Sequence, residues 1–314
     1  MSDVTKKDLV IIGGGPAGMS ASIYAQRALL DAITLEQQAF GGQVLQTSEV
    51  DNYPGVPHTD GYSLMEAMRQ QATDLGACMT TTNVESIERG EDGRFVVTTP
   101  QQAYDARSII LAAGAVPRLA GFEGEKEYIG RGVSYCATCD GMFFRGREVF
   151  VIGGGNSAVE EALFLTRFAS HVTLVVRKDH LRAQRALAKE LEDTGKASIR
   201  FLTSIVKVDG QTAITEITFR NNEDGTQTTD TFEQGVGVFV FVGRVPTSEL
   251  VRDYVETTPA GYVITDAHMA TSTPGIFAAG DVRDTPLRQI VTAASDGAVA
   301  ATAAAAYLGV PVYE

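Results

Sequence analysis

The sequence predicts an α/β fold with two similar domains, the second inserted into the first. An internal repeat is the main observation: residues 9–18 are echoed by residues 149–158, and each copy reads as an apolar strand, a glycine turn and the start of a helix. The same offset aligns the next apolar runs, 32–36 and 172–176, so each copy completes a βαβ unit. Residues 273–281 add one more apolar strand before an alanine-rich helix, and this tail most simply completes the first domain.

Strands that end in proline close each domain. Residues 109–117 and 239–246 are both apolar runs that end in Gly-x-Val-Pro, and the proline stops the strand. We therefore predict a discontinuous first domain over residues 1–115 and 247–314. The inserted second domain is predicted over residues 116–246.

Length, charge and cysteine content narrow the class of protein. The 314 residues fit about two domains at roughly 150 residues each. A formal net charge of −13 opposes binding to nucleic acid or to an anionic membrane surface, so neither is expected as a partner. The N-terminus has no secretory signal pattern, and the alanine-rich run 290–312 is too weakly apolar for a membrane span. Because three cysteines cannot build a secreted disulfide framework, we expect a cytoplasmic protein.

The first glycine turn has the G-x-G-x-x-G spacing of a dinucleotide site. Gly13 allows the tight turn, Gly15 lets backbone amides approach a pyrophosphate, and Gly18 permits close packing of helix on strand. Glu36 ends the next strand, where a carboxylate can accept both hydroxyls of an adenosine ribose. The alternative for Glu36 is a solvated strand end. The first domain is therefore predicted to be Rossmann-like and to bind a dinucleotide.

Four residues near the C-terminal helix bear on which dinucleotide is bound. Gly280 and Asp281 end the last strand, and Arg288 and Gln289 begin the alanine-rich helix. An aspartate there can accept hydroxyl hydrogens from a ribityl chain, and a helix N-terminus can stabilise the negative charge of a reduced flavin. A helix-capping aspartate and an exposed arginine are equally plausible from the local sequence.

The second glycine turn predicts another dinucleotide site, in the inserted domain. Gly153, Gly155 and Ala158 form G-x-G-x-x-A, but Val176 replaces the acid that would bind a ribose hydroxyl. A basic segment follows, with five cations against one acid: Arg177, Lys178, Arg182, Arg185 and Lys189 against Asp179. Cations at the end of this strand suit a 2′-phosphate and favour NADPH over NADH. The alternative is a solvated helix face.

A cysteine pair stands just before the second glycine turn. Cys136 and Cys139 form C-x-x-C, which places two sulfurs on one helical turn, close enough for a disulfide. Asp140 could exchange a proton with a thiolate, or cap the turn. Zinc is the main alternative, but Cys78 and the four histidines lack metal-ligand spacing, so no metal is expected. Cys78 is interpreted as a buried small apolar residue.

Together these motifs resemble the low-molecular-weight, bacterial-type thioredoxin reductases, which are FAD- and NAD(P)-dependent pyridine nucleotide-disulfide oxidoreductases. The similarity covers essentially the whole chain, and the combination of motifs is very specific. The matching segments are 13–18, 41–43 (Gly-Gly-Gln), 52–55 (Asn-Tyr-Pro-Gly), 136–141, 153–158, 280–281 and 288–289.

The resemblance implies an electron path from NADPH to FAD, then to the Cys136–Cys139 disulfide, then to thioredoxin by thiol-disulfide exchange. It implies that Cys139 faces the flavin, that Cys136 attacks the partner's disulfide, and that Asp140 is the acid-base group. It also implies a homodimer and a rotation of the nucleotide domain on the flavin domain. Residues 142–144 resemble the family's thioredoxin-docking surface, although an apolar run of this kind also fits a core.

The motifs and the resemblance together assign two cofactor sites. For FAD the residues are Gly13, Gly15, Pro16, Ala17, Gly18, Glu36, Gly42, Gln43, Asn52, Ala113, Gly114, Gly280, Asp281, Arg288 and Gln289. For NADPH they are Gly153, Gly155, Asn156, Ser157, Ala158, Arg177, Lys178 and Arg182.

Two departures from the family pattern leave alternatives open. The His-Arg-Arg-x-x-x-Arg signature for a 2′-phosphate reads Val176, Arg177, Lys178 and Arg182 here, so a histidine is lost and a lysine, which cannot bind bidentately, replaces an arginine. NADH or ferredoxin as donor stays open, as does another thioredoxin-like or peroxidase-linked partner. Ala113 replaces a threonine, from which we expect a small effect. A non-catalytic redox sensor or zinc-binding module is the alternative from another class.

Overall fold

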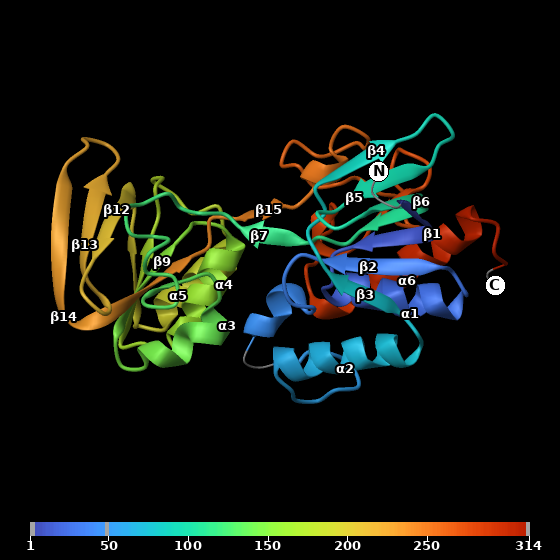
Figure 1. Ribbon diagram of the computed structural model, residues 1–314. Helices are drawn as coiled ribbons and strands as arrows, with labels where there is room; N and C mark the ends of the chain where they lie inside the picture. The colour runs from blue at the N-terminus through green and yellow to red at the C-terminus, as the bar shows by residue number, and fades with distance from the viewer. Residues whose placement is uncertain (1–3, 48–49, 312–314) are drawn as a thin grey trace. The chain divides into compact units, whose positions relative to one another are not determined.

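The computed structural model describes residues 4–47 and 50–311, apart from the side chains of Gln46 and Cys139. It divides into two compact units: unit 1 comprises Met1–Val116 and Val245–Glu314, and unit 2 comprises Pro117–Arg244. The chain passes between them through β7 (Ala115–Pro117) and β15 (Arg244–Pro246), which pair as a two-stranded sheet (Figure 1). Because the chain enters and leaves unit 2 once each, unit 2 is an insertion in unit 1.

A seven-stranded mixed sheet forms the centre of unit 1. Its strands are β1 (Val4–Ile12), β2 (Ala32–Glu36), β3 (Cys78–Thr81), β4 (Ser86–Arg89), β5 (Phe95–Thr98), β6 (Ala103–Leu111) and β16 (Ile276–Ala278). Their order is β3-β2-β1-β6-β5-β4, with β16 also paired to β6. The pairs among β1, β2, β3, β6 and β16 are parallel, whereas β4, β5 and β6 pair antiparallel. The strand near the C-terminus therefore joins the sheet that the N-terminus begins.

Three α-helices and three short 3-10 helices belong to the described part of unit 1. They are α1 (Pro16–Arg27), α2 (Gly61–Asp74), α6 (Ile290–Tyr307), η1 (Gly42–Gln46), η3 (Glu249–Val251) and η4 (Gly280–Val282). A Cβ on Gly297 of α6 would lie 2.0 Å from the carbonyl oxygen of Ala17, so only glycine allows α6 to pack this closely on α1. By length and a mean hydropathy of 1.2, α6 alone among the described helices is apolar enough to cross a membrane, so the expectation that this run is too weakly apolar is wrong on composition. Its packing on α1 is typical of a core helix.

Unit 2 repeats this arrangement around a second seven-stranded sheet. Its strands are β8 (Val133–Ser134), β9 (Glu148–Ile152), β10 (His171–Val175), β11 (Ala197–Arg200), β12 (Thr203–Asp209), β13 (Ile214–Asn221) and β14 (Gln227–Val240). Their order is β11-β10-β9-β14-β13-β12, with β8 also on β14. Its helices are α3 (Ala137–Asp140), η2 (Gly141–Phe144), α4 (Asn156–Leu165) and α5 (Arg185–Asp193). The predicted α/β fold with two Rossmann-like domains is confirmed.

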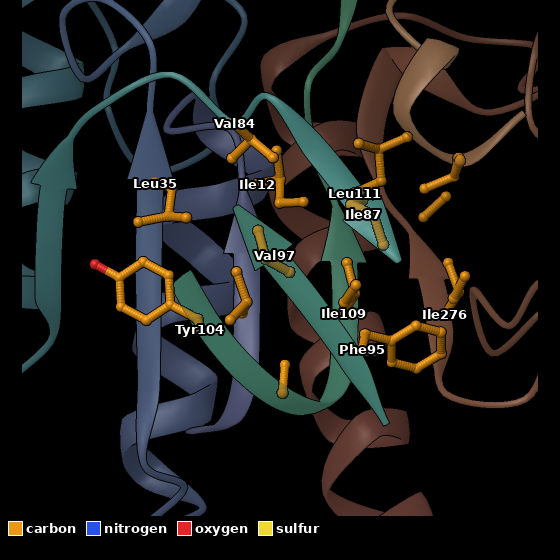
Figure 2. Packing of buried hydrophobic residues seen from close by; sticks show 14 of the residues in the cluster. Ile12, Leu35, Val84, Ile87, Phe95, Val97, Tyr104, Ile109, Leu111 and Ile276 are labelled. Carbon is orange, nitrogen blue, oxygen red and sulfur yellow. The ribbon is translucent and has the colours of Figure 1, made fainter. Parts of the chain in front are cut away.

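The parallel strands are buried on both faces. Along β1, Val10 and Ile12 enter one apolar cluster, and the alternate residues Leu9 and Ile11 enter another, which α1 and α6 cover. Side chains alternate along a strand, so a run of four buried apolar residues is what a strand covered on both sides requires. Figure 2 shows the first cluster, in which residues of β1 and β2 meet residues of the antiparallel strands around Phe95.

Candidate functional site

The first glycine turn joins β1 to α1. Gly13 has a φ of +110°, and a Cβ there would lie 2.3 Å from the carbonyl oxygen of Ala112. A Cβ on Gly18 would lie 1.8 Å from the carbonyl oxygen of Gly13, so α1 packs directly on the turn. By contrast, a Cβ on Gly15, which precedes α1, would meet no described atom within 4 Å. The turn therefore presents an open helix N-terminus, which is the arrangement that a pyrophosphate requires.

Glu36 lies beside this turn and is half-buried. Its carboxylate accepts the backbone N–H of Gly14 at 2.6 Å and that of Gln38 at 2.9 Å. These bonds fix the carboxylate against the turn, so Glu36 is not merely a solvated strand end. A carboxylate has about four acceptor positions, which leaves capacity for the hydroxyls of a ribose.

The segment after β2 returns to the same turn. The N–H of Gly41 donates to the carbonyl of Gly14 at 2.8 Å, and a Cβ on Gly42 would lie 3.5 Å from the Cα of Gly15. The side-chain amide of Gln43 donates to the carbonyl of Ala115. Next to Ala115, Gly114 has a φ of +68°, a left-handed conformation that favours glycine. Ala113 lies on the other side of Gly114, and its backbone nitrogen would be 2.9 Å from a Cβ on Gly13.

Residues from the C-terminal part of unit 1 complete this region. Gly280, with a φ of +75°, lies against α1, because a Cβ there would be 3.0 Å from the Cβ of Ala17. Its N–H donates to Oδ2 of Asp296 at 3.1 Å, and the same oxygen accepts from Nε of Arg283 at 2.7 Å. Asp281 follows within η4 and is half-buried. It therefore does not cap α6.

The start of α6 carries the two other predicted residues. Gln289 caps α6, and its side-chain oxygen also accepts a hydrogen bond from Nδ2 of Asn52 at 3.0 Å. The guanidinium of Arg288 lies 4.3 Å from the centre of the Tyr262 ring. Among the described residues, Arg288 Nε is a buried donor with no hydrogen-bond partner. The alternative of an exposed arginine is therefore wrong, and a buried unpaired donor is a group that a ligand oxygen can satisfy.

The region around the first glycine turn fits a flavin dinucleotide. The open helix N-terminus suits a pyrophosphate, and the carboxylate of Glu36 suits a ribose. Nε of Arg288 is a buried donor with no hydrogen-bond partner among the described residues, and a carbonyl oxygen of the ring would satisfy it.

The second glycine turn, in unit 2, repeats the geometry of the first. Gly153 has a φ of +151°, and a Cβ there would lie 2.5 Å from the carbonyl oxygen of Phe241. A Cβ on Gly155, before α4, would have open space among the described residues. Asn156 and Ser157, the first residues of α4, are exposed, and Ala158 is fully buried.

A loop with three cations, residues 177–184, folds back onto this second turn; we call it the cationic loop. The N–H of Arg182 donates to the carbonyl of Gly154 at 2.7 Å, and the N–H of Gln184 donates to Oδ1 of Asn156 at 2.9 Å. Arg177, Lys178 and Arg182 are all exposed on this loop. The cations of the basic segment 177–189 do not all lie on this loop. Lys189 lies in α5 and forms an ion pair with Asp193 at 2.8 Å. The loop therefore brings Arg177, Lys178 and Arg182 toward the turn, and Arg185 follows it as the first residue of α5.

The cysteine pair lies at the start of α3. Cys136 takes part in a disulfide bond, and its sulfur lies 3.3 Å from Oγ1 of Thr138. The hydroxyl of Ser134 accepts the N–H of Cys136 at 3.1 Å. The N–H of Asp140 donates to the carbonyl of Cys136 at 3.2 Å, which closes one helical turn. Cys139 lies within this turn, but its side chain falls outside the description.

The exposure of the side chains tests two segments that the sequence leaves as possible core, Cys78 and the run 142–144. Cys78 is a free cysteine that is exposed, so its interpretation as a buried residue is wrong. It begins β3, which is an edge strand of its sheet. The run 142–144 divides: Met142 and Phe143 are 52% and 73% exposed, whereas Phe144 packs edge-on against Phe239 with ring centres 5.5 Å apart. The first two residues are therefore the exposed part of this run, and Phe144 is half-buried.

Metal-binding side chains do not gather anywhere in the described chain. Within residues 4–47 and 50–311, no group of three or more His, Cys, Asp or Glu residues is placed to hold a metal ion.

Comparison with known proteins gives a consistent family. The model of the pyridine nucleotide-disulphide oxidoreductase family matches residues 7–297. Thioredoxin reductase of Peptoclostridium acidaminophilum is 45% identical over 307 residues, which cover 96% of each chain. The bifunctional thioredoxin reductase/thioredoxin of Mycobacterium leprae is 46% identical over 97% of this chain and 66% of its own. The crystal structure of Lactococcus lactis thioredoxin reductase superposes with a TM-score of 0.79 at 42% identity, covering 96% of this chain and 99% of that one. The chain therefore belongs to the pyridine nucleotide-disulphide oxidoreductase family, within the bacterial-type thioredoxin reductases.

Proposed function

We propose that this protein is an NADPH-dependent thioredoxin-disulfide reductase that uses FAD. The observation that carries this proposal is the disulfide-bonded Cys136 at the start of α3, in the same unit as a second dinucleotide turn. The thioredoxin reductase relatives, one of them fused to thioredoxin, support thioredoxin as the partner.

In unit 1, the chain's own residues would bind and orient FAD. The N-terminus of α1 would hold the pyrophosphate, Glu36 the adenosine ribose, and Asp281 the ribityl hydroxyls. Arg288 and the N-terminus of α6 would stabilise negative charge on the ring. When bound, FAD accepts a hydride and passes two electrons to a disulfide.

In unit 2, the second glycine turn would bind the pyrophosphate of NADPH at the N-terminus of α4. Val176 is 3% exposed and offers no acceptor for a ribose hydroxyl. Arg177, Lys178 and Arg182 are exposed cations that can pair with a 2′-phosphate. This charge arrangement favours NADPH over NADH as the donor.

The cysteine pair would then reduce the partner. The thiolate of Cys136 attacks one sulfur of the partner's disulfide, and the departing sulfur takes a proton from Asp140. Asp140, now deprotonated, takes the proton of the Cys139 thiol, and the Cys139 sulfur attacks Cys136 and displaces the second partner sulfur, which takes up that proton. This restores the Cys136–Cys139 bond and releases the partner as a dithiol. The exposed Met142 and Phe143 would contact the partner. We further propose that the enzyme is a cytoplasmic homodimer.

Anaerobic titration of the flavoprotein tests the proposal. NADPH is expected to bleach the flavin absorbance at a lower concentration than NADH, and oxidised thioredoxin is expected to restore it. If reduced ferredoxin bleaches the flavin and neither nucleotide does, the donor assignment is wrong. Purified protein that is colourless and holds stoichiometric zinc would contradict the enzyme assignment altogether.

A further inference from the structure

The cationic loop is fastened to distant parts of unit 2 at its first two residues as well as at the glycine turn. The carbonyl of Arg177 accepts a hydrogen bond from Nδ2 of Asn222 at 3.1 Å. The carbonyl of the next residue, Lys178, accepts the N–H of Leu202 at 3.0 Å. The backbone that carries these two cations is therefore held by residues that lie far from it in the sequence.

Asn222 joins three segments of the chain. It follows β13, at the turn that leads to β14, and its N–H donates to the carbonyl of Leu202 at 2.6 Å. Its Nδ2 lies 3.0 Å from the hydroxyl of Ser204 in β12, while it also reaches Arg177. The Asn222 side chain is exposed, so apolar packing does not explain these contacts.

Leu202 connects the two contacts through an unfavourable backbone conformation. Its φ of +49° lies in the left-handed region, which leucine rarely adopts. In this conformation its N–H bonds to Lys178 and its carbonyl bonds to Asn222. Such a conformation persists where the surrounding structure determines it, and it often occurs close to functional sites.

Placement of the backbone matters at this site because its cations are exposed and are not fixed by ion pairs among the described residues. The ion pairs of the described residues do not include Arg177, Lys178 or Arg182. Lys178 is a point charge on a flexible stem and cannot fix a phosphate by bidentate geometry. A backbone that is already ordered reduces the entropy lost when these side chains close on a phosphate.

We propose that Asn222 is a positioning residue that sets the preference for a 2′-phosphorylated nicotinamide nucleotide. It acts through the backbone of the cationic loop, with Ser204 as its support, and does not touch the nucleotide. This inference rests on the proposed binding of NADPH in unit 2.

The test measures binding of NADP⁺ and of NAD⁺ to the oxidised, FAD-loaded enzyme by titration calorimetry. Asn222→Ala is expected to weaken NADP⁺ binding about three- to tenfold, the range that one hydrogen bond supplies, and to change NAD⁺ binding less than about twofold. Ser204→Ala, which removes the support, should shift NADP⁺ binding in the same direction by less. Thr229→Val is the matched control, because it removes a hydroxyl contact with Thr218 (2.9 Å) in the same hairpin and should leave both affinities unchanged.

The results distinguish a failure of the role proposed for Asn222 from a failure of the proposed NADPH site. If Arg177→Ala and Lys178→Ala weaken NADP⁺ binding while Asn222→Ala and Ser204→Ala do not, the role of Asn222 is overturned. An equal loss of NADP⁺ and NAD⁺ binding in Asn222→Ala also overturns it, since that is the result of a general structural role. If Arg177→Ala and Lys178→Ala leave NADP⁺ binding unchanged, the 2′-phosphate site itself is wrong.

Discussion

Removing Arg283 is expected to destabilise unit 1 by leaving a carboxylate buried without its counter-charge. Asp296 lies inside α6, and the side chains of Arg283 and Asp296 are 15% and 11% exposed. One carboxylate oxygen accepts both Nε of Arg283, at 2.7 Å, and the N–H of Gly280, at 3.1 Å. In Arg283→Met the second bond remains, but the carboxylate loses the cation with which it pairs among the described residues.

The size of the effect follows from this burial. Breaking a buried pair by removing one partner costs about 3–5 kcal/mol of unfolding free energy, and the slight exposure of both groups places this pair at about 3 kcal/mol. The double variant Arg283→Met with Asp296→Asn removes the charge as well. Its amide oxygen can still accept from Gly280, so we expect a total loss of about 1–2 kcal/mol.

The wild type, Arg283→Met, Asp296→Asn and the double variant form a double-mutant cycle. Urea unfolding of these four proteins, each with the same excess of FAD, measures their free energies of unfolding. Circular dichroism and flavin fluorescence should be followed together, because two units can unfold separately. A coupling energy of at least about 1 kcal/mol is expected between the two sites. If Arg283→Met costs less than about 1 kcal/mol, or if the two single effects simply add, the account of this pair is refuted.

Four further predictions concern the site and its supports. Cys136→Ser should abolish thioredoxin reduction while NADPH still bleaches the flavin; loss of bleaching would place the cysteine elsewhere in the electron path. Gly18→Ala should lower the free energy of unfolding by about 2 kcal/mol or more and release FAD, because the added methyl would lie 1.8 Å from a backbone oxygen. An unchanged flavin content of the purified variant would contradict this. Phe143→Asp should raise the KM for thioredoxin about tenfold without changing the Tm, since the ring is 73% exposed; an unchanged KM would remove it from the docking surface. Burial, and then the charge of Glu160, raise the pKa of Glu161 above its usual 4.5. The folded state is therefore favoured while this carboxyl is protonated. It loses that advantage as the pH rises through the pKa that Glu161 has in the folded protein. Glu161→Gln should therefore raise the Tm at neutral pH and leave it unchanged below about pH 4.5, and a gain that persists at low pH would refute this.

The fold followed from the sequence because its signals are local. The two glycine turns, the strands on either side of them and the run of four buried residues in β1 all reflect spacing within about thirty residues. The same holds for the placement of Glu36, since a parallel second strand brings its end back to the turn.

Features that depend on distant contacts were not predictable. The local neighbours of Cys78 are apolar, but its exposure depends on how β3, an edge strand, is covered by the rest of the fold. The stacking of Arg288 on Tyr262 and the contact of Asn222 with Arg177 join residues more than twenty positions apart, and no motif marks them. The cation count of the basic segment did not reveal that Lys189 is paired with Asp193.

The paired strands β7 and β15 have a consequence for protein engineering. The N–H of Thr247 donates to the carbonyl of Gly114 at 3.0 Å in unit 1, and the N–H of Arg118 donates to the carbonyl of Gly243 at 2.9 Å in unit 2. The two cut ends of each unit would thus lie one strand spacing apart if the chain were severed there. A linker of a few residues could close either gap, so each half of the molecule can be designed as a separate, continuous gene product.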